Sequence, residues 1–138
     1  MFDARGDAVN ALADRGRVLQ FAREREGTRV VTAEEARSLA LELPEAVEQD
    51  HHGRPSFRVA GKIFATLWSE SRMNVMLDED GILTAIERTP DVCSEVWWGK
   101  RLAAVAVDLP RADAHLLAEL LADAWEGKAP ERLTNERP

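Results

Sequence analysis

Hydrophobic positions in this chain follow two spacings, and the first is helical. Between Thr32 and Leu43 apolar residues recur every three or four positions, which predicts a helix. Thr32 and Glu35 have the spacing of a capping box, in which each side chain bonds an exposed amide of the first turn. Pro44 predicts where the helix ends. The expected buried face consists of Ala36, Leu39, Ala40 and Leu43.

Between Val47 and Asp78 the spacing becomes the alternation of strands. The expected strands are Val47–His51, Ser56–Val59, Ile63–Trp68 and Arg72–Leu77. A three-residue loop from Ala60 to Lys62 would give a clean apolar face. That face would carry Phe57, Val59, Ile63, Ala65 and Leu67. The opposite face would carry Arg54, Ser56, Arg58, Phe64, Thr66 and Trp68.

The rest of the chain, from residue 78 on, predicts two helices around one buried strand. Acidic residues 78–80 favour a helix start through the helix dipole, and Gly127 would cap the last helix. The expected elements are a short helix over Ile82–Glu87, a loop or short helical turn over Asp91–Lys100, a strand over Leu102–Leu109 and an amphipathic helix over Ala112–Trp125.

The order of these elements predicts an α+β fold, a single domain in which helices pack on one side of an antiparallel sheet. The order is helix, three or four strands, helix, strand, helix, and a chain of 138 residues is sized for one domain. We place this domain at residues 32–133. Residues 1–31 are expected to form a peripheral extension with weak helical character, and residues 134–138 a frayed tail.

Charge is distributed unevenly along the chain. The net charge is −7, which opposes tight non-specific binding to nucleic acid. Within residues 51–77, however, the only acid is Glu70, and four basic residues accompany it. The segments on both sides are acidic, so the predicted strands carry a local basic surface on an acidic body. The basic residues are Arg54, Arg58, Lys62 and Arg72.

Several kinds of chemistry lack the residues they need. No run of 18 apolar residues occurs, so no membrane span is expected. Cys93 is the only cysteine, which excludes an intramolecular disulfide and fits a cytoplasmic protein, and its acidic neighbours disfavour the thiolate. His51 and His52 are adjacent on a predicted strand and should point to opposite faces. We therefore expect neither a catalytic site, a metal site nor a cofactor, and predict that the protein is not an enzyme.

The ordered set of segments resembles the MmcQ/YjbR family of small bacterial proteins. The resemblance extends over roughly Thr32–Leu133, with a leucine-rich helix after the last strand. Leu102 stands where many members have a tryptophan, and the first 30 residues have no counterpart in a typical member. The similar segments are Ala40–Ala46, Gly53–Ala65, Val107–Leu109, Ala124-Trp125 and Ala129–Leu133.

The resemblance implies an α+β fold and DNA binding, since members are usually described as DNA-binding from the likeness of their fold to double-wing modules. We expect such binding to be weak and salt-sensitive. The candidate contacts to nucleic acid are Arg54, Arg58, Lys62, Arg72, Lys100 and Arg101. The candidates for stacking or interaction are Phe64, Trp68, Trp97 and Trp98.

Two alternatives stay open at this level. The protein could be a protein-interaction module, as a homodimer or in a chaperone-like role, that uses the same sheet face and Trp97-Trp98. The basic side chains could also be an ordinary solvated face, with the aromatic residues packed in the core.

Overall fold

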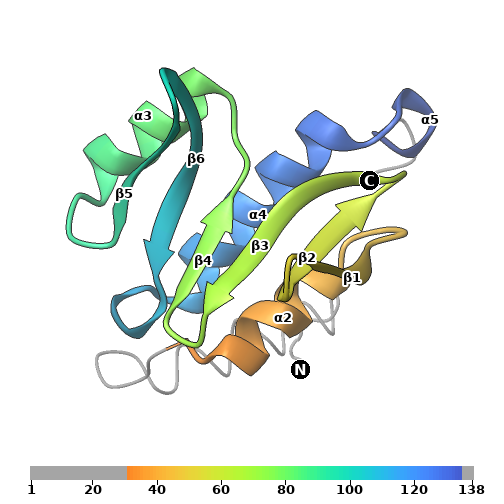
Figure 1. The fold of residues 1–138 in the computed structure, drawn as a ribbon, viewed down its shortest axis with the longest axis horizontal. Helices are drawn as coiled ribbons and strands as arrows, with labels where there is room; N and C mark the ends of the chain where they lie inside the picture. Colours follow the sequence, from red (N-terminus) through yellow and green to blue (C-terminus); the bar gives the residue numbers. More distant parts are fainter. Residues whose placement is uncertain (1–30, 135–138) are drawn as a thin grey trace.

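The computed structural model describes residues 31–134 as one six-stranded antiparallel sheet with helices on one side (Figure 1). The strand order is β1-β2-β3-β4-β6-β5. The α+β prediction is therefore confirmed. In chain order the elements are α2 (Ala33–Leu41), β1 (Val47–His51), β2 (Arg54–Val59), β3 (Lys62–Ser69), β4 (Arg72–Val75), α3 (Glu79–Arg88), β5 (Cys93–Trp98), β6 (Arg101–Asp108), a 3-10 turn (Leu109–Arg111), α4 (Ala114–Lys128) and α5 (Glu131–Thr134).

Two expected segments lie largely outside the described residues. The predicted extension, with its weak helical pattern, is outside them except for Val31, which is buried and whose N–H donates to the Leu109 carbonyl. Thr134, expected at the start of a frayed tail, is the last residue of α5. In the described part of the chain, we find no helix with the length and apolar character to cross a membrane.

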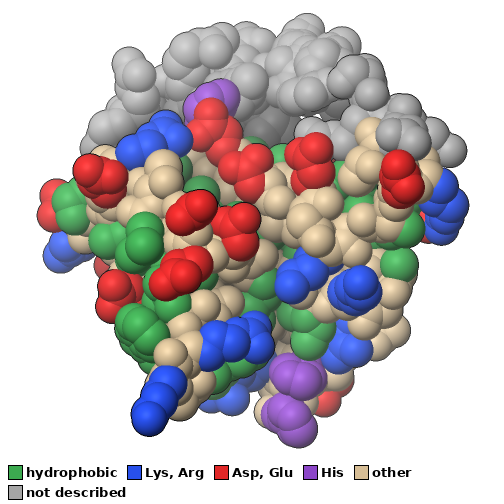
Figure 2. Space-filling model, turned by 90° about the horizontal axis from the view of Figure 1, so that it is seen from above, with side chains coloured by type: hydrophobic (Ala, Val, Ile, Leu, Met, Phe, Trp, Pro, Cys, Tyr) green, Lys and Arg blue, Asp and Glu red, His purple; other side chains and the backbone are tan. Residues whose placement is uncertain are grey.

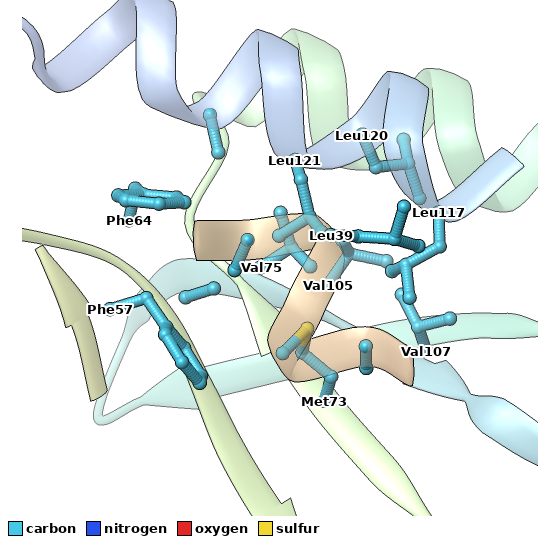
Figure 3. Close-up of a cluster of buried hydrophobic side chains, with 14 of the residues drawn as sticks. Leu39, Phe57, Phe64, Met73, Val75, Val105, Val107, Leu117, Leu120 and Leu121 are labelled. Carbon is cyan, nitrogen blue, oxygen red and sulfur yellow. The ribbon is translucent and has the colours of Figure 1, made fainter. Parts of the chain in front are cut away.

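The hydrophobic core fills the space between the helices and one face of the sheet. In Figure 1 strands β3 and β4 pass in front of α4, and Figure 3 shows Leu117 and Leu121 of that helix over Val105 of β6. Ile82 of α3 is buried in the same cluster. Since all helices share this core, the other face of the sheet carries no helix among the described residues.

Side-chain caps fix where the helices begin. The predicted capping box is present, because the Thr32 hydroxyl accepts from the Glu35 N–H and Glu35 Oε1 accepts from the Thr32 N–H, both at 3.1 Å. Asp78 caps α3, which therefore starts earlier than predicted. Gly127 was predicted as a C-cap but lies inside α4, which continues to Lys128.

The β2–β3 hairpin corrects one predicted feature. Its turn has two residues, Ala60 and Gly61, with φ of 51° and 82°, so Val59 pairs with Lys62. Two positive φ values define the tight turn that matches strand twist. Phe64 is then passed over in the pairing, as in a β-bulge. The bulge turns Phe64 into the core and leaves Ile63 outside, the reverse of the prediction, and restores the predicted faces from Ala65 onward.

The segment predicted as a loop before the last strand is itself a strand. β5 pairs with β6 through a two-residue turn at Gly99 and Lys100, so two strands, not one, separate α3 from α4. Only Cys93 is buried in β5. An edge strand exposed on both faces has no apolar alternation, which is why its sequence did not predict it.

Strand β4 is shorter than predicted. It was expected to reach Leu77 but ends at Val75. The last backbone hydrogen bond to β3 follows directly after the strand, from the Met76 N–H to the Phe64 carbonyl, at 2.9 Å. Strands β3 and β6 each have 8 residues, against 4 in β4. The starting ends of β3 and β6 therefore extend beyond β4 and, within residues 31–134, have no strand between them.

Candidate functional site

A hollow of about 1270 Å³ extends along the open face of the sheet to this end, where β4 stops between β3 and β6. The β2–β3 hairpin forms one side and the β5–β6 hairpin the other, and residues of α3 and α4 line the back. Figure 2 looks onto this end of the molecule: basic side chains gather in the lower half of the view and acidic side chains in the upper half. The geometry therefore joins the open sheet face to a concave site.

The structure brings four of the six predicted basic residues to the hollow. Arg72 lies on the open face beside it, and Lys100 occupies the turn next to Arg101. The basic residues of the two hairpins that line the hollow are Arg54, Arg58, Lys62 and Arg101. Arg88 and Lys128, which were not predicted, line its helical side.

Two of these arginines are held by their neighbours. Arg54 Nε donates to the Trp68 carbonyl at 3.0 Å, and its guanidinium carbon lies 3.8 Å from the centre of the Trp68 ring. Arg58 Nε donates to Ser56 Oγ at 3.0 Å. A guanidinium fixed through Nε still presents its terminal N–H groups to an anion.

The predicted aromatic candidates separate into three groups. Phe64 is fully buried and is not a stacking residue, because the bulge places it in the core. Trp68 and Trp98 line the hollow and are about half exposed. Trp97 does not line it; its Nε1 donates to Glu95 Oε1 at 2.9 Å. Neighbouring strand residues point to opposite faces, which separates Trp97 from Trp98.

The base of the hollow holds polar residues that the sequence analysis did not propose as site residues. Ser56, Thr66 and Asn74 pair across β2, β3 and β4 and are buried, although they face away from the core. Thr66 and Asn74 also line the hollow. The sequence does show one polar residue in the middle of each of these three strands. It could not show that the three residues would lie side by side, because that depends on how the strands pair.

Acidic residues line the opposite wall. They come from the start of α3 and from α4, and they are Asp78, Glu79, Asp80 and Asp123. The predicted role of the α3 acids at a helix start is confirmed for Asp78, whose Oδ1 accepts from the Gly81 N–H at 2.7 Å. The helical side also carries Arg88 and Lys128. A ligand in the hollow would therefore meet four basic side chains on the sheet side and a smaller negative excess, four acids against two bases, on the helical side.

The histidines of the β1–β2 turn differ from prediction. Their rings lie 4.4 Å apart between centres, because His52 leaves the strand with a φ of 55°, and both residues line the hollow. Within residues 31–134, no group of three or more His, Cys, Asp or Glu side chains is placed to hold a metal ion.

Cys93 lies away from the hollow, buried between β5 and the helices. Burial raises the pKa of its thiol, and the hydroxyl of Thr89 donates to Sγ at 3.3 Å. The cause expected from the sequence was neighbouring acids; the main cause is loss of solvent. A raised pKa disfavours the thiolate that nucleophilic chemistry requires.

The comparisons with known proteins agree with this architecture. A family model described as YjbR matches residues 41–127, which contain every strand and most of the hollow. The crystal structure of Deinococcus radiodurans protein DR2400, described as a DUF419 domain, is similar with a TM-score of 0.61 and 19% identity, covering 78% of this chain and 88% of that one. No curated protein matches the chain.

Proposed function

This chain belongs to the YjbR family, and we propose that it is a small non-catalytic binding protein that holds DNA against the hollow and the open sheet face. The observation that supports the proposal is the convergence of Arg54, Arg58, Lys62 and Arg101 on one concave site in a chain of net charge −7. Basic side chains scattered over a solvated surface would not share one hollow.

Phosphate is the ligand group that these side chains suit best. Guanidinium groups form charge-assisted, paired hydrogen bonds with phosphate oxygens, and contacts of Arg54 with Trp68 and of Arg58 with Ser56 orient them beforehand. The overall negative charge repels DNA at long range, so binding should be modest. A cytoplasmic location is part of the proposal, since the single cysteine suits a reducing compartment.

Salt dependence measures the number of phosphate contacts. Each contact contributes about −0.9 to the slope of log K against log salt for a duplex and about −0.7 for a single strand. With up to four basic side chains engaged, the slope should reach about −3.6 for a duplex and about −2.8 for a single strand, and affinity should fall steeply between about 50 mM and about 200 mM salt. Fluorescence anisotropy with labelled duplex and single-stranded DNA gives this slope directly.

Charge reversal identifies the face that binds. Arg54→Glu combined with Arg58→Glu should abolish binding at low salt. Arg111→Glu combined with Arg132→Glu gives the same net charge but alters residues that do not line the hollow, so this control should keep most of the affinity. Absence of binding by the natural protein at low salt would refute the proposal, as would equal loss in both double variants.

A second candidate function is a protein-interaction module that uses β5. This strand is a sheet edge, and Trp97 is about half exposed on it without lining the hollow. An unpaired edge with an exposed aromatic side chain can pair with another chain, including a second copy. Light scattering should then show an oligomer that persists in salt and is weakened by Trp97→Ser but not by Trp98→Ser. A monomer at all concentrations would exclude the homodimer.

A further inference from the structure

Two buried side chains at the base of the hollow have unused hydrogen-bonding capacity. Thr66 and Asn74 pair across β3 and β4 and are 4% and 3% exposed. Asn74 Oδ1 accepts from Arg72 Nε at 3.0 Å, which fixes the direction of its amide. Among residues 31–134, no acceptor contacts Asn74 Nδ2 and no partner contacts the Thr66 hydroxyl. Buried polar groups are normally satisfied, so these two point to a ligand atom between the hairpins.

The walls above this base suit a flat aromatic group. Ile63 and Met76 line the hollow as half-buried apolar side chains, and Trp98 lines it with an exposed ring. Trp68 is the poorer stacking surface, because the Arg54 guanidinium already lies 3.8 Å from its ring centre. Arg101 is farther from Trp98, at 5.4 Å. An aromatic ring could therefore stack on Trp98. Trp98 pairs with Arg101, and Asn74 pairs with Ala106, five positions farther along β6, so Thr66 and Asn74 would contact a different part of the same ligand.

The charges fix the direction of such a ligand. Positive side chains stand on the two hairpins, and the acids of α3 stand behind. A nucleotide that enters from the sheet side places its phosphates on the hairpins and its base inward, where carboxylates can accept from base amino groups. A hollow of about 1270 Å³ is larger than the roughly 300–1,000 Å³ of ordinary small-molecule sites, so flanking phosphates also fit.

We infer that the hollow seats unpaired bases, one of them stacked on Trp98, so the preferred ligand is a single strand rather than a duplex; this inference rests on the DNA binding proposed above. The bases of a duplex are stacked and paired, and their edges cannot reach two residues that are buried between the hairpins. A duplex would also bring its second row of phosphates toward the acidic wall. A splayed single strand avoids both conflicts.

The first test compares three labelled probes of about 12 nucleotides by anisotropy: a single strand, its duplex and an abasic strand with the same number of phosphates. We expect the single strand to bind at least about tenfold more tightly than the other two. The abasic strand isolates the base, because it keeps the phosphates that meet the arginines.

The second test uses two matched pairs of variants. Trp98→Leu should weaken single-strand binding about tenfold, and Trp97→Leu, which alters an equally exposed neighbour outside the hollow, should leave it unchanged. Thr66→Val removes the buried hydroxyl and should reduce the preference for the strand over the abasic probe, whereas Thr66→Ser should keep it. Because Trp98 is exposed, its replacement keeps the fold even if Thr66→Val does not.

The outcomes separate this inference from the proposed function. If all three probes bind equally while Arg54→Glu with Arg58→Glu still abolishes binding, the phosphate face stands and the base site is refuted. Equal effects of Trp97→Leu and Trp98→Leu would also refute the base site. If no probe binds at low salt, both proposals fall. A strand preference that Trp98→Leu removes and Trp97→Leu does not would support the base site.

Discussion

Individual aromatic side chains have opposite environments in this protein. Phe64 and Trp125 are fully buried, whereas Trp68, Trp97 and Trp98 are between 43% and 52% exposed. A buried ring stabilises the fold by its removal from water, whereas an exposed ring contributes little, so Phe64 and Trp125 should matter for stability more than the three exposed tryptophans.

Replacing Phe64 should therefore harm folding more than replacing an exposed tryptophan. Phe64→Ala should lower the free energy of unfolding by about 3–5 kcal/mol, because it removes a fully buried ring and leaves a cavity. Trp97→Ala should change it by less than about 1 kcal/mol. Urea denaturation measures both. A small effect of Phe64→Ala would mean that the bulge does not hold this ring in the core.

The buried thiol of Cys93 predicts a pH dependence of stability. Burial raises its pKa above the ordinary 9.0, so the thiol ionises in the unfolded chain before it does so in the folded protein. The buried neutral thiol therefore stabilises the folded protein fully below the pKa that the thiol has in the unfolded chain. This stabilisation is lost as pH rises toward the higher pKa of the thiol in the folded protein. The difference in unfolding free energy between the natural protein and Cys93→Ala should therefore narrow between pH about 7.5 and about 10. A constant difference would contradict this.

At the level of elements, the two-residue turn at Ala60-Gly61 sets the pairing of the β2–β3 hairpin. Gly61→Ala should destabilise by about 1 kcal/mol, because φ is +82° there and a Cβ is unfavourable in that conformation. Gly127→Ala is the matched control: a Cβ meets nothing within 4 Å at either position, but Gly127 is helical. This control should stabilise by about 0.5–1 kcal/mol, and thermal denaturation should show opposite shifts.

Elements with one buried face could be predicted from the sequence, and those without one could not. The helix after Thr32 and the strand over Ile63–Trp68 were predicted because core contacts impose a period on them. The bulge at Phe64 was missed because it cancels the effect of the turn. The turn is one residue shorter than predicted and the bulge adds one unpaired residue, so every position from Ala65 onward keeps the expected face. β5 was missed because only one of its residues is buried.

For the whole molecule, contacts near residue 45 join the start of the domain to its end. Trp125 Nε1 donates to the Pro44 carbonyl at 2.9 Å, and Arg132 contacts both carboxylate oxygens of Glu45 at 3.1 Å. These residues are more than 80 positions apart in the sequence. They attach α4 and α5 to the segment after α2.

The Arg132 contact lowers the pKa of Glu45, and removing it should reverse that shift. The hydrogen bonds from Arg132 hold the carboxyl below its ordinary 4.5, so Arg132→Met should raise the pKa toward that value. The Glu45 carboxyl has a lower pKa in the folded protein than in the unfolded chain. The Glu45–Arg132 pair therefore stabilises the fold at pH values above the unfolded pKa, and this stabilisation is lost as pH falls through the folded pKa. An NMR titration of the Glu45 carboxyl should show the rise; an unchanged pKa would mean that the pair does not form in solution.

The candidate site could be predicted only in part, for reasons that belong to the whole molecule. Local charge counting identified Arg54, Arg58 and Lys62, since all three lie within one hairpin. The hollow itself depends on where β4 ends between β3 and β6. The alternation of residues in the sequence predicted that this strand would continue to Leu77, so it did not reveal the early end. Thr66 and Asn74 align only through the pairing of β3 with β4.

The shortness of β4 also gives this sheet an uneven stiffness. Its four residues and the Met76 N–H, which donates to the Phe64 carbonyl, connect the hairpin on one side to the hairpin on the other, and beyond Met76 the two hairpins are separate. The tips of the two hairpins are therefore not joined to each other by backbone hydrogen bonds of the sheet. A ligand that bridges the tips would tether the two hairpins, and part of its binding energy would offset the lost freedom.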